Sequence, residues 1–298
     1  MKYSYQIICQ DLLKDSPERV KNIIERRFGL TKQNSKQETL ESIGQTYGLT
    51  RERVRQIQDV ALVRIREKAE LKYSDVFNYF IDYIKKQGGF RREDLLFNEL
   101  GKNYENNIFF LMILGEPFER LRENKDFYSF WTINKNSSDY AKKTINSFVS
   151  YLKKGEKPEP IKNFQLPSSI LIKVRKSGWN KEWIKSSLEI SKYILKGVDN
   201  LYGLGDWIET NPKTVRDKVY LVFKKQNKPL HFSQIPGIIE ELKTSISEEP
   251  VLERNWIKPI HPQTVHNELI KDPRFVLIGR GLYVLKDWGY SPGMVKDV

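Results

Sequence analysis

The spacing of apolar residues predicts three helices in the first part of the chain, at about residues 17–28, 40–47 and 51–71. A start signal precedes each of them, which is Ser16-Pro17 for the first helix and a threonine, Thr39 or Thr50, for the other two. Gly29 and Gly48 are expected to end the first and the second helix. Because the apolar positions of each helix share one face, we expect the three to pack together.

A second unit follows, in which the same periodicity predicts helices at residues 73–87, 90–100 and 108–114. The segment 118–133 is rich in aromatic residues and is interrupted by Asn124-Lys125-Asp126, so we expect a small hairpin there. Three short helices and a hairpin are the plan of a winged helix. The sequence therefore predicts a second module over residues 73–135.

Residues 136–210 are expected to connect this unit to the last one. The pattern predicts helices at residues 137–152 and 180–195, a linker at 153–160 and a loop at 202–207. The linker is inferred from its charges, two prolines and one glycine, which do not favour packing.

The last module, residues 211–298, repeats the order of three helices and a hairpin. Its elements are expected at residues 215–223, 231–242 and 262–271 for the helices, and at 275–278 and 282–285 for the strands. Asn211-Pro212 is expected to start the first helix, residues 243–260 to form a loop, and Gly279-Arg280-Gly281 to form the hairpin turn. With residues 1–72 as a first module, the fold class is mainly α and multi-domain, with small β-hairpin wings.

Composition narrows the class of function. The chain of 298 residues has 51 Lys+Arg against 38 Asp+Glu, a net charge of +13, which favours a polyanionic partner such as nucleic acid. Its apolar runs are shorter than a membrane span. A single cysteine, Cys9, and three histidines disfavour disulfides and a Cys/His zinc site, so we expect no metal. The sequence predicts a soluble protein of the cytoplasm, associated with the nucleoid.

The strongest functional signal is the stretch 39–66, where a helix, a glycine turn and a second capped helix predict a helix-turn-helix. The first turns of the second helix carry the side chains that read DNA bases or bind phosphates, namely Arg51, Glu52, Arg53, Arg55 and Gln56. Residues 19–72 hold 13 Lys+Arg and 7 Asp+Glu, a net charge of +6, which is nearly half of the net charge of the whole chain. An Arg-rich helix can instead be a solvated face, or serve protein contacts alone.

The segments Thr39–Gly44 and Leu49–Gln58 resemble region 4 of the housekeeping sigma factors of bacterial RNA polymerase. The resemblance covers about 55 residues. It implies that three side chains contact bases of the upstream promoter hexamer, namely Arg51, Glu52 and Gln56. It implies that four others contact phosphates, namely Thr39, Thr50, Arg53 and Arg55. The same helix would also meet the flap of the polymerase. Because no part of the chain resembles the region that melts promoters, we expect it not to open promoters alone.

The segments Lys228–Phe232 and Phe275–Leu285 resemble the HARE-type winged helix found in the delta subunit of RNA polymerase. In a DNA-binding interpretation, the third helix and the wing supply the contacts, from Thr264, His266, Asn267, Lys271 and Arg280. Residues 213–231 add six Lys+Arg and one Asp. The alternative is that this module serves protein contacts and its wing is structural.

An enzyme is disfavoured, because the sequence has no phosphate-binding Gly-rich loop and no activated nucleophile. No cofactor or small-molecule substrate is expected. A membrane-surface helix is also disfavoured, because the apolar face of helix 51–71 lacks Trp and Phe. The preferred interpretation is a sequence-specific double-stranded DNA-binding transcription factor that acts with RNA polymerase. The alternative is a polymerase-binding adaptor whose modules make protein contacts.

Overall fold

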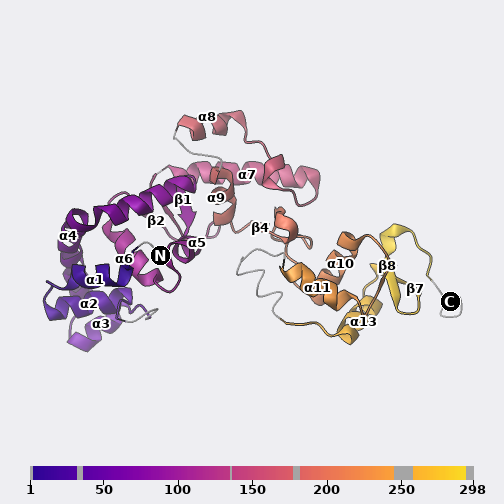
Figure 1. The fold of residues 1–298 in the computed structure, drawn as a ribbon, viewed down its shortest axis with the longest axis horizontal. Helices are drawn as coiled ribbons and strands as arrows, with labels where there is room; N and C mark the ends of the chain where they lie inside the picture. Colours follow the sequence, from indigo (N-terminus) through magenta and orange to yellow (C-terminus); the bar gives the residue numbers. More distant parts are fainter. Residues whose placement is uncertain (1–2, 32–35, 135, 177–181, 245–257, 293–298) are drawn as a thin grey trace. The chain divides into compact units, whose positions relative to one another are not determined.

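The computed structural model describes residues 3–31, 36–134, 136–176, 182–244 and 258–292. The chain divides into two compact units, one made of residues 1–143 with 168–190 and the other of residues 144–167 with 191–298 (Figure 1). Helices dominate both units, and the strands form small antiparallel sheets, which confirms the mainly α fold class. Among the described helices, none combines the length and the apolar character needed to cross a bilayer.

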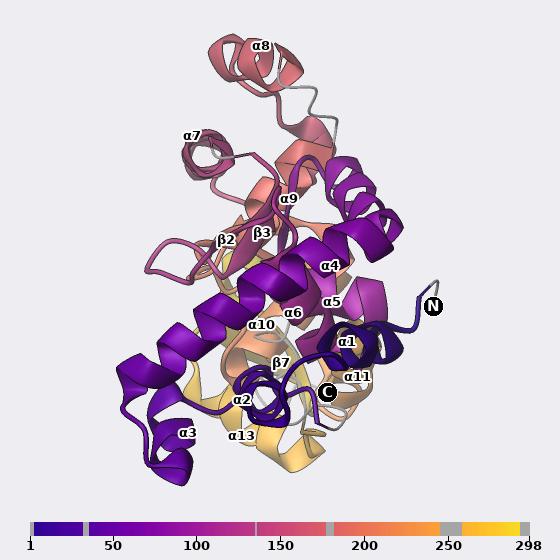
Figure 2. The ribbon, with the colours of Figure 1, turned by 90° about the vertical axis from the view of Figure 1, so that its left-hand side faces the viewer.

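The first unit is a helical cluster beside a small sheet. Its helices are α1 (Tyr5–Leu13), α2 (Glu18–Phe28), α3 (Leu40–Tyr47), α4 (Arg51–Lys86), α5 (Glu93–Gly101), α6 (Glu105–Leu114), α8 (Ser168–Lys176) and α9 (Glu182–Ile190). Its strands are β1 (Phe90–Arg92), β2 (Glu119–Leu121) and β3 (Phe130–Thr132). Figure 2 shows α4 crossing the unit from its start beside α3.

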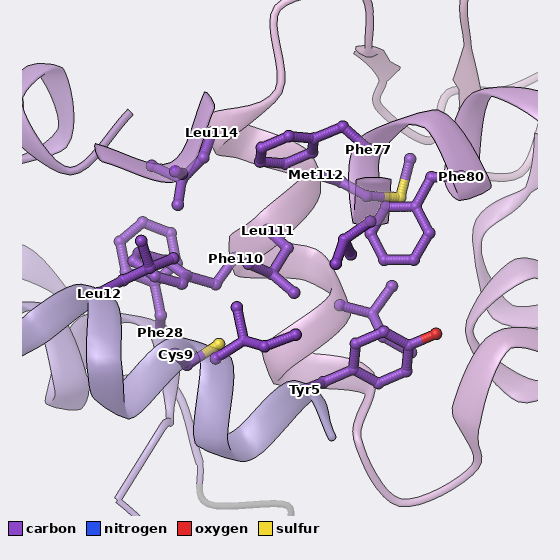
Figure 3. Packing of buried hydrophobic residues seen from close by; sticks show 14 of the residues in the cluster. Tyr5, Cys9, Leu12, Phe28, Phe77, Phe80, Phe110, Leu111, Met112 and Leu114 are labelled. Atoms are coloured by element: carbon purple, nitrogen blue, oxygen red, sulfur yellow. The ribbon is translucent and has the colours of Figure 1, made fainter. Parts of the chain in front are cut away.

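One core joins the segments predicted as the first and second modules. Aromatic and aliphatic side chains from α1, α2, α4 and α6 meet in it, as Figure 3 shows for Tyr5, Phe28, Phe80 and Phe110. The Phe28 and Phe110 rings have centroids 5.1 Å apart. Cys9 is buried in the same core, where burial raises the pKa of its thiol to about 12. Helices α2 and α4 therefore share a core with α6, which lies in the predicted second module.

The helices predicted at 51–71 and 73–87 are one element, α4, which bends at Tyr73 (φ −128°, ψ 27°). Within this element the predicted separation into two helices is confirmed, because the backbone at Tyr73 is non-helical and two helices meet across the kink there. The Tyr73 hydroxyl donates a hydrogen bond to Asp11 on α1 (2.9 Å), so a tertiary contact lies at the bend. The boundary predicted after residue 72 falls at this bend, and the four-module division stays a prediction.

The helix predicted from Phe90 starts three residues later, at Glu93, because Phe90–Arg92 form strand β1. This strand pairs antiparallel with β3, which also pairs with β2, so the sheet order is β1-β3-β2. The Phe90 ring packs edge-on against Trp183 of α9 (4.7 Å between centroids), a contact that local periodicity does not reveal. The predicted turn at residues 124–126 is confirmed, because the Asn124 side chain accepts the backbone N–H of Asp126.

In the connecting region, the predicted helix at 137–152 is present as α7 (Ser137–Gly155), which spans the division between the two units. The helix predicted over 180–195 ends at Ile190, and the predicted loop at 202–207 begins as a strand. Together, β4 (Ile194–Lys196) and β5 (Tyr202–Leu204) form a hairpin. The linker prediction was also wrong in part, because α7 extends to Gly155 and Glu159 forms a β-bridge with Tyr202.

The C-terminal part of the second unit has the predicted order of three helices and a hairpin. Its elements are α10 (Val215–Gln226), β6 (Leu230–His231), α11 (Ile235–Thr244), α13 (Pro262–Lys271), β7 (Phe275–Gly279) and β8 (Leu282–Leu285). The three strands form one sheet in the order β6-β8-β7. The predicted loop at 243–260 lies mostly outside the described residues.

Two predicted helix starts in this part were wrong. Helix α10 is capped by Thr214 in a capping box with Asp217, and not by Asn211. Helix α11 begins at Ile235, because His231 belongs to strand β6 and pairs with Leu282.

Candidate nucleic-acid interface

Helices α3 and α4 form the helix-turn-helix, and their ends are defined by local hydrogen bonds. The Thr39 hydroxyl accepts the backbone N–H of Ser42 (3.1 Å), and the Thr50 hydroxyl accepts that of Arg53 (3.2 Å). Gly48 ends α3 in the left-handed conformation (φ 63°). These caps and this end confirm the predicted helix boundaries. Whether the two threonines also contact phosphates stays a prediction.

The turn between α3 and α4 is tight. A Cβ built on Gly44 would lie 2.6 Å from the backbone oxygen of Leu49, so a larger residue would push the helices apart. Below the turn, Ile23, Ile43 and Val54 are fully buried and hold α2, α3 and the start of α4 together. Pro17 precedes α2, and no side-chain cap is present there, so the expected cap from Ser16 was wrong.

The first two turns of α4 expose a row of polar side chains. The five residues predicted to contact DNA are all exposed, namely Arg51, Glu52, Arg53, Arg55 and Gln56, and together they are called the reading head below. The turn and caps described above place them on one rigid helix end, which is the geometry that entry into a major groove requires.

Side chains of this row bind one another. The Arg55 guanidinium contacts Glu52 (Nη2–Oε1, 2.7 Å) and Asp59 (Nη1–Oδ2, 2.6 Å). The hydrogen bond from Arg55 lowers the pKa of the Glu52 carboxyl, which stays ionised at neutral pH. Arg53 donates to the Gln56 side chain (Nη1–Oε1, 3.2 Å). Exposed pairs of this kind contribute about 0–1 kcal/mol, so DNA can exchange them at little cost.

Part of the basic charge that the sequence placed near this helix has structural partners. Arg26 forms a bidentate pair with Glu38 (Nη2–Oε2, 2.7 Å). Arg66 donates to the Leu114 carbonyl (Nε–O, 3.0 Å), and Lys68 pairs with Asp15 (Nζ–Oδ2, 2.6 Å). The positive charge without an ion-pair partner is therefore smaller than the charge count indicates.

An apolar groove beside the reading head was missed by the sequence analysis. It has a volume of about 480 Å³ and lies between α4 and the segment that leads into α2, and its apolar wall includes Pro17, Val20, Ile57 and Val60. The Val60 side chain is 57% exposed. In the sequence, Val60 is an apolar residue outside the buried stripe of α4, and this position could have indicated an apolar surface that binds a partner.

The C-terminal candidates lie on two elements, α13 and the β7–β8 turn. Thr264, Asn267 and Lys271 are exposed on α13, and Arg280 is exposed at the turn. His266 is half-buried, and its ring stacks on Phe232 (4.4 Å between centroids). It therefore helps to pack α13 on the segment after β6, a role that the sequence analysis did not assign to it.

The basic segment before the wing is also partly neutralised. Arg216 pairs with Glu268 on α13 (Nε–Oε2, 3.0 Å), and Lys225 pairs with Asp199 (Nζ–Oδ2, 2.8 Å). Lys218 is buried, and its burial lowers the pKa of its ammonium group. Arg280, by contrast, has no hydrogen bond or ion pair with any described residue.

Comparison with known proteins agrees with this geometry over the helix-turn-helix. The family model for Sigma-70, region 4 matches residues 13–67. RNA polymerase sigma factor SigA of Bacillus sp is 40% identical over 63 residues, which are 21% of this chain and 16% of that relative. The chain therefore covers a small share of that relative's length. Residues 13–67 therefore match the sigma-70 region 4 domain, and α3 and the start of α4 form a helix-turn-helix within them.

Proposed function

We propose that this protein binds double-stranded DNA sequence-specifically, at promoter-like sites, and acts together with RNA polymerase. The observation that carries the proposal is the exposed row Arg51–Gln56 at the capped start of α4, inside the matched region 4 domain. In this proposal Arg51, Glu52 and Gln56 contact base edges, while Arg53 and Arg55 contact phosphates together with the Thr39 and Thr50 segments. The protein acts by binding rather than catalysis, in the cytoplasm at the nucleoid.

The test is selection of bound sequences from a random duplex pool, using the full chain. Base contacts predict one enriched motif, and phosphate contacts predict an affinity that falls steeply with salt. A folded protein that enriches no motif at low salt would contradict the promoter-reading proposal. That result would favour the alternative function, a polymerase-binding adaptor whose modules make protein contacts.

The apolar groove supports a second candidate function, contact with RNA polymerase through α2 and α4. A half-exposed valine in a groove flanked by Arg53 and Arg64 favours an apolar partner helix with acidic residues at its edges. We expect Val60→Gln to weaken binding to purified RNA polymerase about ten-fold, since a buried valine contributes about 1.5 kcal/mol. The measurement is a polymerase titration by surface plasmon resonance.

Val63→Gln is the matched control, because Val63 is 55% exposed on the same helix and does not line the groove. Equal polymerase affinity of the two variants would rule out the groove as the contact. Both variants should retain the DNA motif of the unmodified protein.

For the C-terminal unit we propose a HARE-type winged helix that contacts DNA through α13 and the wing. The exposed Arg280 supports this proposal, and Thr264, His266, Asn267 and Lys271 are the other candidate contacts. Arg280→Ala is expected to weaken binding to all duplexes alike and to lower the salt slope by about one, as for the loss of one phosphate contact. The measurement is DNA affinity by fluorescence anisotropy at several salt concentrations.

Lys286→Ala removes the same charge from an exposed site in this unit and serves as the control. A salt slope that is unchanged in Arg280→Ala would favour the alternative, in which this unit contacts protein.

A further inference from the structure

A polar cavity of about 760 Å³ lies on the side of α4 that faces α6, within the first unit. Its walls come from the end of α2, from α4, from the starts of α5 and α6, and from the strand β2 with the residue after it. Its size is in the range of small-molecule sites. The cavity is separate from the reading head, since none of the residues Arg51–Gln56 lines it.

Two arginines converge on this cavity without a carboxylate partner among the described residues. Arg27 is half-buried, and within the described residues its guanidinium donates only to the backbone oxygen of Glu38 (Nη1–O, 3.0 Å). Arg122, the residue after β2, also lines the cavity and is exposed. Burial, and then the charge of Arg122, lower the pKa of Arg27. Two guanidinium groups held this way favour an anion that can bridge them.

The third arginine of the cavity, Arg120, is already neutralised. It forms a bidentate contact with Glu93 and lies over the Phe109 ring (5.2 Å to the centroid). The Trp131 indole N–H also donates to Glu93 (2.9 Å). This group therefore forms one wall of the cavity, and among its arginines Arg27 and Arg122 are the two without a carboxylate partner in the described residues.

Two residues that line the same cavity each have a buried acceptor atom without a donor among the described residues. Gln58 Oε1 on α4 and Glu105 Oε2 on α6 are buried, and neither has a hydrogen-bond partner in the part of the chain that the structure describes. Buried acceptors are almost always paired in folded proteins, and an unpaired one calls for a ligand or an ordered water. A ligand that satisfies this site must therefore carry donors as well as negative charge.

We propose that this cavity binds a nucleotide. Its phosphate would bridge the Arg27 and Arg122 guanidinium groups, and its hydroxyl or amino groups would donate to Gln58 Oε1 and Glu105 Oε2. Phe97, Phe109 and Leu62 give the cavity an apolar wall for the base. The bound nucleotide would connect α2, α4 and α6, and so brace the helix that carries the reading head.

The test is isothermal titration of the full chain with AMP, GMP, adenosine and inorganic phosphate. We expect saturable binding of at least one mononucleotide, and binding of adenosine at least about ten-fold weaker, because it cannot make the charge-assisted hydrogen bonds. Arg122→Gln is expected to weaken mononucleotide binding about ten-fold or more. Because Arg122 is exposed and makes no ion pair with the described residues, this variant should fold normally.

Lys125→Gln removes the same charge from an exposed position in the same loop, outside the cavity, and should bind like the unmodified protein. Three results would each overturn the proposal: no saturable binding of AMP or GMP at millimolar concentration, equal binding of AMP and adenosine, or equal loss in the two variants. Arg51→Ala/Gln56→Ala should retain nucleotide binding, so this test stands apart from that of promoter reading.

Discussion

Replacing Arg51 and Gln56 by alanine is expected to reduce the preference for the selected DNA motif about 100-fold, since each good base contact contributes about 1–3 kcal/mol. Affinity for unrelated duplexes should fall much less, because Arg53 and Arg55 remain to contact phosphates. The loss should appear as a blurred motif in sequence selection, and as similar affinities for motif and scrambled duplex in anisotropy titrations.

The fold should survive this change, because both side chains are exposed and lie outside the core. Surface substitutions of this kind usually alter stability by about 0.5 kcal/mol or less. Lys102→Ala, which removes one exposed charge just after α5, is the control and should keep the motif sharp. A double variant with an unchanged motif would show that α4 does not read the bases.

Phe110→Ala is expected to destabilise the first unit by about 3–5 kcal/mol, the usual cost of emptying a fully buried phenylalanine site. Phe110 is 0% exposed and packs on Phe28, at the end of the helix that supports the helix-turn-helix (Figure 3). DNA binding should therefore fall as well, although this residue lies 43 positions beyond the matched region 4 segment. Hydrogen exchange of peptides from α2, α4 and α6 measures the effect, because a chain with two units does not give one unfolding transition.

Leu71→Ala provides the control, since Leu71 is 88% exposed on α4 and its truncation should leave exchange rates unchanged. If Phe110→Ala accelerated exchange in α6 but not in α2 and α4, the helix-turn-helix would be shown to fold independently of the segment after it. The shared core predicts instead that all three helices lose protection together.

The fold could be predicted from sequence where its signals are local. Thr39, Gly48 and Thr50 define helix ends through hydrogen bonds and backbone angles that involve only the next few residues. The same reason explains the correct bounds of α13, whose proline stands in its first turn. The candidate reading head could also be predicted from the sequence, because the exposure of side chains at the start of a capped amphipathic helix follows from its periodicity.

The sequence did not reveal features that depend on distant partners. Strand β1 forms because it pairs with β3, about 40 residues downstream, and strand β5 forms because it pairs with β4. Local periodicity assigned the first to a helix and the second to a loop, since neither partner is visible within a helical window.

By itself, the sequence determined the helix-turn-helix, its charge and the side chains it exposes, because these follow from spacing along one or two helices. Tertiary structure alone decided that α2 and α4 share a core with α6, that Arg26, Arg66 and Lys68 are structural, and that Arg27 and Arg122 line one cavity. The physical reason is the same in each case. Packing and charge pairing depend on distances in space, and these are set by contacts between residues far apart in the chain.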